Sequence, residues 1–251
     1  MKVWRLLSET ATSPVKQTWE ISLELGNELN DAAWMDQNGY STLYLTTNDR
    51  LVLEYKFPQE GSQPPTQSSL NHLYAQIVQL YPQTGGDLLI GVKDSGGLDI
   101  FDTGRHVIEY AWKMFDKGAP AISWSPDPNY FLVTHANNEI RLYDLRKGVF
   151  NKSFSGFKYL IDQIYIKLPK KVMEAAFHGP DQIVIRMQES EYLYLYDIKT
   201  KSINSLIGTE GEIVEKIVAL PNFRFATIAK TGLIRIYDST SNNSSNYVEK
   251  P

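Results

Sequence analysis

One short phrase, repeated along the chain, constrains the fold more than any other feature. Residues 140–145 read Ile-Arg-Leu-Tyr-Asp-Leu and run into a turn at residues 146–148. Apolar residues alternate with polar or aromatic ones, which is the period of a β-strand. Variants end at Asp102, Asp197 and Asp238, and looser variants lie at residues 1–6 and 51–56. The chain is therefore predicted to be a series of similar strand-rich units.

Each full unit places two further strand-like runs before the phrase, with turn residues between them. In the clearest unit, residues 121–127 end in Ser-Pro-Asp, residues 130–134 are apolar, and Asn137-Asn138 precedes the phrase. A repeat of roughly 40–53 residues is typical of four-stranded blades. Blades packed side by side bury both faces of each sheet, which explains strands that are apolar on both faces. We predict an all-β fold, a β-propeller of four-stranded antiparallel blades, with five to six blades in this chain.

The order of strands, turns and aromatic-Asp endings resembles the WD-repeat family of β-propellers. The best match is Ser125-Pro126-Asp127 with Tyr143-Asp144. The aromatic-Asp ending also occurs at Phe101-Asp102, Tyr196-Asp197 and Tyr237-Asp238. The resemblance covers residues 1–238, and it implies a propeller that binds other proteins through its loops. We therefore predict one propeller domain over residues 1–238, in one alternative only part of a propeller, and a disordered Ser/Asn-rich tail over residues 239–251.

The chain departs from that family in two ways. None of its four histidines follows a glycine before a first strand, so apolar packing is expected to hold these blades together. Members of the family usually close with about seven blades, whereas this sequence shows five strand triplets and an extra strand pair at its start. Three alternatives follow: closure by pairing that strand pair with the last triplet, a fragment, or a ring completed by another chain.

Composition narrows the class of partner. The net charge is −4, and nucleic-acid-binding surfaces are usually basic, so nucleic acid is not favoured as a direct partner. The absence of cysteine excludes disulfides and thiolate metal sites. No apolar run approaches the roughly 20 residues that span a bilayer, so no membrane contact is predicted. We expect an intracellular chain, cytoplasmic or nuclear.

Carboxylates are the strongest candidates for chemistry. The aspartates that end the phrase are interpreted as acceptors for hydrogen bonds from the turn that follows. Four carboxylates on or beside innermost strands are interpreted as solvated strand ends: Asp31, Glu174, Glu212 and Glu215. The alternative function is a central-channel glycan-binding protein or glycoside-processing enzyme, which needs two carboxylates about 5–10 Å apart. No catalytic, cofactor or metal site is predicted.

Loops that interrupt the repeat are the candidate binding surface, because a rigid scaffold presents its binding residues on loops. The turns between second and third strands contribute Arg50, Asp94, Asn137, Glu189 and Lys230. Residues 157–171 are interpreted as an insertion outside the blades, either an extra strand or a short helix. This segment contributes Tyr159, Ile161, Tyr165, Lys167, Lys170 and Lys171. The predicted function is a non-enzymatic protein–protein interaction scaffold in a multi-protein assembly, with other proteins as partners, one of which completes the propeller in one alternative.

Overall fold

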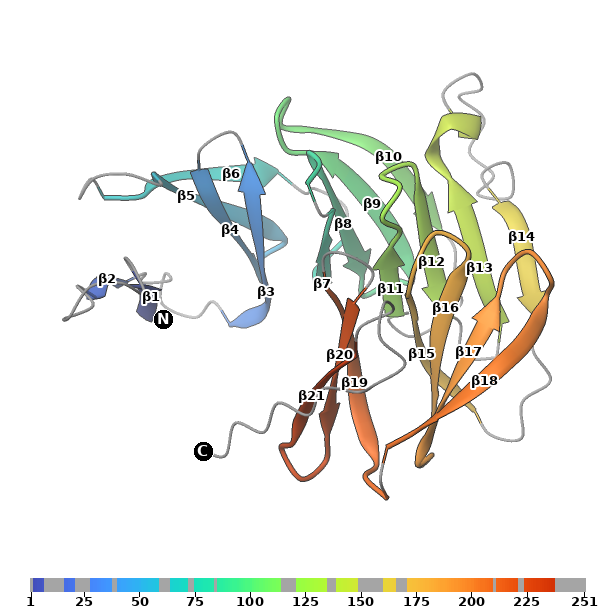
Figure 1. Cartoon of the computed structure of the whole chain (residues 1–251). Coiled ribbons are helices and arrows are strands. Elements are labelled where there is room, and N and C mark those ends of the chain that lie inside the picture. Colours follow the sequence, from blue (N-terminus) through green and yellow to red (C-terminus); the bar gives the residue numbers. More distant parts are fainter. Residues whose placement is uncertain are drawn as a thin grey trace. The chain divides into compact units, whose positions relative to one another are not determined.

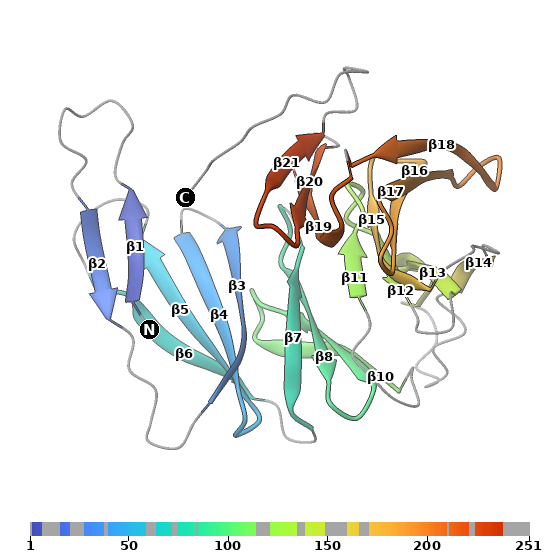
Figure 2. The ribbon, with the colours of Figure 1, turned by 90° about the horizontal axis from the view of Figure 1, so that it is seen from below.

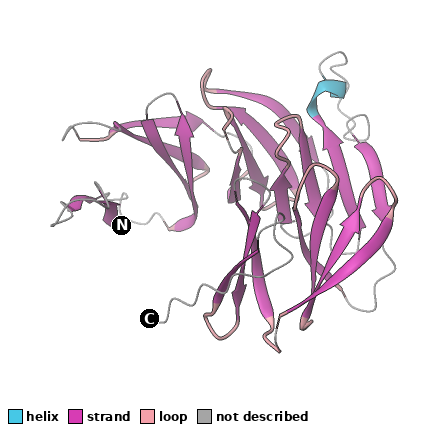
Figure 3. Cartoon of the chain, in the orientation of Figure 1, coloured by secondary structure: helices cyan, strands magenta, loops and turns pink. Residues whose placement is uncertain are grey.

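The structure is a computed structural model of the whole chain. It describes residues 2–6, 16–20, 28–37, 40–58, 64–71, 75–83, 85–113, 121–134, 139–148, 160–165, 171–209, 211–220 and 224–237. In these residues nearly all regular structure is β-strand, and the one helix is the short 3₁₀ turn η1 (Leu145–Gly148; Figure 3). None of the described helical residues forms a segment long and apolar enough to cross a membrane.

The strands group into sheets in chain order (Figure 1). A two-stranded sheet contains β1 (Lys2–Leu6) and β2 (Lys16–Glu20). The first blade contains β3 (Leu29–Gln37), β4 (Tyr40–Thr47), β5 (Leu51–Pro58) and β6 (Thr66–Asn71). The second contains β7 (Ile77–Pro82), β8 (Leu88–Lys93), β9 (Gly97–Asp102) and β10 (Val107–Lys113).

Three further blades follow. The third contains β11 (Ala121–Trp124), β12 (Tyr130–Thr134), β13 (Glu139–Asp144) and β14 (Leu160–Tyr165). The fourth contains β15 (Val172–Phe177), β16 (Gln182–Met187), β17 (Tyr192–Asp197) and β18 (Ser202–Gly208). The fifth has three strands in the described residues: β19 (Val214–Leu220), β20 (Arg224–Ala229) and β21 (Ile234–Tyr237). The predicted all-β propeller fold of antiparallel blades is confirmed.

The chain divides into two compact units, one of Met1–Ser95 with Asp99–Tyr110 and one of Gly96–Leu98 with Ala111–Pro251. The first includes the first blade and most of the second, and these two sheets lie side by side (Figure 2). The second unit includes the third, fourth and fifth blades. The single-domain boundary at residue 238 stays a prediction, and the predicted tail, residues 239–251, lies outside the described residues.

Alternate residues of one strand pack against different neighbouring blades, which is the reason for strands that are apolar on both faces. On β17, Leu193 joins a buried cluster with Ile217 and Phe225 of the fifth blade. Tyr196 of the same strand joins a cluster with Leu132 of the third blade. Successive side chains of a strand point to opposite faces, so the fourth blade contributes to two hydrophobic cores.

In the first unit, too, neighbouring blades share a hydrophobic core. One buried cluster contains residues of the first blade and of the second: Ala33, Met35, Tyr44, Val52, Leu70, Ile77, Leu80, Leu89 and Phe101. Gly91 lies on β8 where a Cβ atom would be 2.9 Å from Phe101 Cε2 and 3.0 Å from Ile77 Cδ1. The chain therefore has a glycine there because two large side chains fill the space.

For Leu160–Tyr165, the interpretation of residues 157–171 as an insertion outside the blades is wrong. Leu160–Tyr165 is strand β14, and it pairs antiparallel with β13 as the fourth strand of the third blade. Tyr165 is opposite Glu139 and Leu160 is opposite Tyr143, with a register shift between Leu142 and Tyr143. The connection before β14 is longer than the corresponding connection in the first, second and fourth blades, and this spacing concealed the fourth strand.

Candidate protein-binding turns

The turns between second and third strands are anchored in the same way in four blades. The first residue after the second strand donates its backbone N–H to the carbonyl of the residue that precedes the first strand of that blade. The pairs are Asn48 with Glu28 (3.1 Å), Asp94 with Gln76 (2.9 Å), Gln188 with Lys171 (2.8 Å) and Lys230 with Ile213 (2.9 Å). A hydrogen bond at a fixed point of each blade holds the turn against the innermost strand.

Side chains of these turns add further anchors. The Asn48 side-chain oxygen accepts the Glu28 backbone N–H at 3.2 Å. In the fifth blade, the Thr231 hydroxyl donates to Glu212 Oε2 at 2.8 Å. In the fourth, buried Ser190 accepts the Tyr192 N–H at 3.2 Å. Glu212 therefore binds a turn of its own blade.

The backbone of the turns is left-handed at one residue each. Gly96 and Gly232 have φ of 84° and 85°, and Arg50 takes the same place in the first blade with φ of 67°. In the fourth blade Glu189 has φ of 48°. Glycine adopts this conformation readily, whereas a side chain makes it strained. The turns therefore share a hairpin geometry but differ in the side chains that they expose.

The structure places four of the five predicted turn residues in exposed turns. Arg50, Asp94, Glu189 and Lys230 are all exposed, one in each of four blades. Asn137 lies outside the described residues. Lys171, predicted as part of a separate basic cluster, is exposed directly before β15, and its carbonyl anchors the turn of Glu189. Their binding role stays a prediction.

Of the other residues predicted in the 157–171 segment, Ile161 and Tyr165 are not part of these turns. Ile161 and Tyr165 belong to β14, and Tyr159, Lys167 and Lys170 lie outside the described residues. The sequence did not reveal three of the residues that anchor these turns. Each directly precedes the first strand of its blade: Glu28, Gln76 and Ile213. Their side chains are chemically different, and they anchor the turns through backbone atoms, so no residue pattern in the sequence identifies them.

Three of the aspartates that end the repeated phrase lie at the opposite end of the blades, where each binds the turn that follows its strand. Asp102 accepts the Arg105 N–H at 2.8 Å, Asp144 the Arg146 N–H at 2.9 Å, and Asp197 the Thr200 N–H at 2.8 Å. These bonds confirm the turn role predicted for these aspartates. Asp238 lies outside the described residues.

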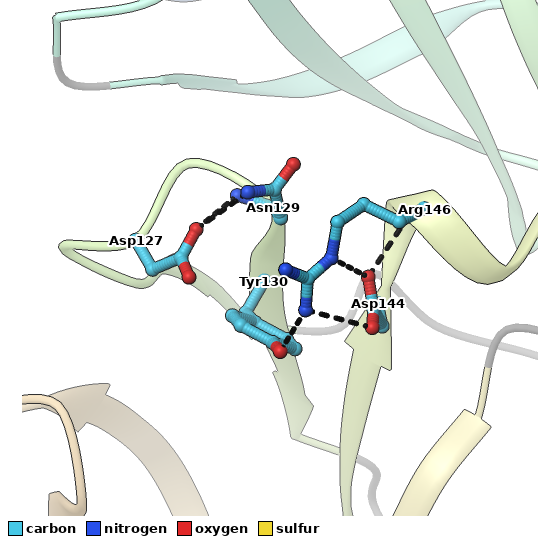
Figure 4. A network of polar contacts seen from close by, with 5 residues as sticks. All are labelled: Asp127, Asn129, Tyr130, Asp144 and Arg146. Atoms are coloured by element: carbon cyan, nitrogen blue, oxygen red, sulfur yellow. Dashed lines mark hydrogen bonds and ion pairs between the residues drawn. The ribbon is translucent and has the colours of Figure 1, made fainter.

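The third blade shows this end in detail (Figure 4). The Arg146 guanidinium binds both oxygens of Asp144, at 3.0 and 3.1 Å, and lies 4.8 Å from the centre of the Tyr130 ring. Asp127 accepts two hydrogen bonds from Asn129 at 2.9 and 2.8 Å. Charge-assisted bonds of this kind fix the geometry of the two turns.

Two of the innermost-strand carboxylates are not solvated strand ends, and that interpretation is corrected. Asp31 Oδ2 on β3 accepts the Leu80 N–H of the second blade at 2.8 Å. Glu174 Oε2 on β15 accepts the Ile217 N–H of the fifth blade at 2.8 Å. Both follow a β-bulge at the same point of the first strand. We call this contact the inter-blade tie.

The Glu174 tie is partly buried and charged. Burial raises the pKa of the Glu174 carboxyl, and the Ile217 N–H, Arg186 and Lys216 oppose this rise. Arg186 Nε lies 3.4 Å from Glu174 Oε2, and its Nη1 donates to the Val214 carbonyl at 3.3 Å. The carboxylate and the guanidinium of the fourth blade thus both bind backbone atoms of the fifth.

A polar cluster in the first unit is built around a buried carboxylate. Glu54 is fully buried, and its carboxylate accepts hydrogen bonds from Tyr44 at 2.8 Å and from Ser68. Lys56 Nζ lies 3.3 Å and His106 Nε2 3.5 Å from it. Burial, and then the Glu54 charge, raise the pKa of Tyr44 far above its ordinary value. Because Glu54 has no exposed surface, its carboxylate is satisfied by these internal partners and is not open to a ligand.

No group of three or more His, Asp or Glu side chains that would suit a metal ion occurs within the described ranges. No family model matches the chain. No curated protein sequence matches it.

Two solved structures are similar to the chain in fold. Raptor from Chaetomium thermophilum aligns with a TM-score of 0.65 at 12% identity over 90% of this chain and 21% of the Raptor chain. A chain of the mitotic checkpoint complex aligns with a TM-score of 0.64 at 12% identity over 94% of this chain and 68% of that chain. This chain thus spans about a fifth of the Raptor chain. At such identity the likenesses show the fold alone, a β-propeller.

Proposed function

We propose that this protein is a non-enzymatic protein–protein interaction scaffold of the WD-repeat type, a subunit of a multi-protein assembly inside the cell, cytoplasmic or nuclear. The observation that carries the proposal is the set of turns between second and third strands. Four are anchored by equivalent hydrogen bonds, and each exposes a different charged side chain.

The physical argument concerns entropy and specificity. A turn that is already fixed loses little conformational freedom when it meets a partner, so more of the contact energy contributes to affinity. Arg50 and Lys230 are positive, whereas Asp94 and Glu189 are negative. A mixture of positive and negative side chains on fixed turns discriminates between partners through electrostatic complementarity.

The comparisons agree with this proposal in a limited way. One similar structure is described as a mitotic checkpoint complex, so a propeller of this fold occurs there in an assembly. The glycoside-processing alternative has less support, because Asp31 and Glu174 bind backbone N–H groups of neighbouring blades. A carboxylate that serves as a catalytic acid must be able to contact substrate.

Affinity purification from the source organism tests the proposal. The tagged full chain and the variants Arg50→Glu, Lys171→Glu, Glu189→Lys and Lys230→Glu are purified, and co-purifying chains are quantified by mass spectrometry. We expect at least one stoichiometric partner to be reduced by about tenfold or more in a turn variant, as for loss of a charged contact worth about 1.4 kcal/mol. Thermal unfolding midpoints should stay unchanged, because these side chains are exposed.

The matched control is Lys199→Glu. Lys199 is an exposed lysine at the other end of the fourth blade, where it binds Asp181 at 2.6 Å. Lys199→Glu makes the same change in charge as Lys171→Glu, but it lies at the other end of the blade from the turn of Glu189. A set of partners that responds equally to both lysine variants, or that responds to none of the turn variants, contradicts the proposed use of the turns.

A further inference from the structure

Thr209 is a buried junction between the turns of two neighbouring blades. It lies in the connection from β18 of the fourth blade to β19 of the fifth, and it is 1% exposed. Its backbone N–H and its hydroxyl both donate to the Glu191 carbonyl, at 3.0 and 2.6 Å. Glu191 belongs to the turn between β16 and β17. Thr209 therefore binds the fourth-blade turn directly.

The same residue binds two parts of the fifth blade. Its hydroxyl also donates to the Glu212 carbonyl, so its single proton is shared between two acceptors. The Thr209 carbonyl accepts the Glu212 N–H at 3.1 Å and a hydrogen bond from buried Arg235 on β21. Every polar atom of Thr209 thus has a partner, and the partners come from both blades.

The Glu212 side chain extends this series of contacts to the fifth-blade turn. Its Oε2 accepts the Thr231 hydroxyl at 2.8 Å, and the carbonyl of the adjacent Ile213 accepts the Lys230 N–H at 2.9 Å. Hydrogen bonds therefore lead from the fourth-blade turn through Thr209 to the fifth-blade turn, and all of these residues belong to the second compact unit. The two turns are thus fixed relative to each other as well as to their own blades.

The two coupled turns expose side chains of opposite charge. Glu189 is exposed in the fourth-blade turn, and Lys230 is exposed in the fifth-blade turn. When two contacts are held on one rigid frame, formation of the first raises the effective concentration for the second. A partner that binds one turn therefore gains most affinity if it also carries a complementary charge for the other turn.

We infer that Thr209 is a positioning residue that makes the fourth- and fifth-blade turns one binding surface. The partner of this surface is a single protein that presents a basic group to Glu189 and an acidic group to Lys230. The inference rests on the proposed function, because it requires that the turns bind a protein. It adds which two turns act together and which residue couples them.

The coupling can be measured without the partner, because the chain has no cysteine and labels can be placed at will. Spin labels on Glu189→Cys and Lys230→Cys report the distribution of distances between the two turns by pulsed electron paramagnetic resonance. Thr209→Val should broaden this distribution by about twofold or more, because the turns then lose the hydroxyl that joins them. Thr209→Ser keeps the hydroxyl and should retain the narrow distribution.

Thr134→Val is the matched control for loss of a buried hydroxyl in the same unit. Thr134 is 4% exposed, and its hydroxyl has no hydrogen-bond partner among the described residues. This variant should leave the distance distribution unchanged. A distribution that Thr209→Val does not broaden, or that Thr134→Val broadens equally, overturns the inference.

Quantitative affinity purification then tests for a single partner. Glu189→Lys and Lys230→Glu should each reduce the same co-purifying chain by about tenfold or more. Thr209→Val should reduce that chain by about threefold or more, whereas Thr209→Ser and Thr134→Val should not. The double variant Glu189→Lys with Lys230→Glu restores the net charge of −4 but exchanges the two charges. It should bind this chain no better than either single variant.

The results distinguish failure of this inference from failure of the proposed function. Loss of different chains in Glu189→Lys and Lys230→Glu overturns the inference, while the turns remain binding surfaces. Recovery of binding in the double variant, or full binding by Thr209→Val, overturns it in the same way. Loss of no chain in any turn variant contradicts both the inference and the proposed function.

Discussion

At the scale of the residue, backbone conformation and single hydrogen bonds decide most of what distinguishes one blade from another. Arg50 stands in a left-handed turn position where two other blades have glycine. Asp102 ends its strand as a turn acceptor, as do Asp144 and Asp197. Both effects are local, so each can be measured by one substitution.

Arg50→Gly is expected to stabilise the protein by about 0.5–1 kcal/mol. Glycine removes the strain of a φ of 67°, and its greater entropy in the unfolded chain only partly offsets this gain. Urea unfolding measures the change. Lys230 is also in an exposed turn, but its φ is not positive, so glycine there relieves no strain. Lys230→Gly should therefore lower stability by about 0.5–1 kcal/mol. A loss of stability in Arg50→Gly contradicts the strain argument.

Asp102→Asn is expected to lower stability at neutral pH by about 1 kcal/mol. Partial burial pushes the pKa of Asp102 upward, but the Arg105 backbone N–H, its guanidinium and the Gly104 N–H outweigh burial and leave it below the ordinary 3.8. A lowered pKa in the folded state stabilises the protein above pH 3.8 and loses that effect as pH falls through the folded pKa. Urea unfolding at pH 7 and near pH 3.5 should show the difference between wild type and variant shrinking. If the stability difference between wild type and Asp102→Asn is the same at both pH values, the charge of Asp102 does not explain it.

At the scale of the element, the first strands of two blades each carry a polar contact to the next blade. β3 and β15 each have a bulge followed by a carboxylate that binds the next blade. A bulge changes the direction of a side chain in the strand. The two features together therefore turn an otherwise solvent-facing carboxylate toward a neighbouring backbone.

Asp31→Ala is expected to destabilise the protein by about 1–3 kcal/mol, because it leaves the Leu80 N–H without its acceptor. Asp31→Asn keeps an acceptor oxygen and should cost less. Asp36→Ala on the same strand removes an exposed carboxylate that accepts a hydrogen bond from Ser41, and should cost under about 0.5 kcal/mol. Equal effects of Asp31→Ala and Asp36→Ala in urea unfolding would falsify the tie.

At the scale of the whole molecule, the chain forms two compact units, and each contains one of the two charged ties. The Asp31 tie lies in the first unit, and the Glu174 tie lies in the second. Each tie joins blades of its own unit. Loss of one tie is therefore expected to reduce local stability mainly in the unit that contains it.

Hydrogen exchange with mass spectrometry tests this division. Asp31→Ala should reduce protection mainly in β3–β8, and Glu174→Ala mainly in β15–β20, because opening reactions follow cooperative units. Each variant serves as the control for the other. Equal loss of protection throughout the chain in both variants means that the blades unfold as one unit.

The sequence by itself determined the fold class, the blade repeat and the role of the phrase-ending aspartates, because strand period and turn chemistry are local properties. It also located the exposed turns, since Arg50, Asp94, Glu189 and Lys230 each directly follow or fall within a hairpin signal. Only the tertiary structure decided the rest. Whether Asp31 faces water or Leu80, and whether residues 160–165 pair with β13, both depend on neighbours distant in sequence. A residue pattern gives the direction of a side chain along its own strand, but what lies opposite is set by packing between blades.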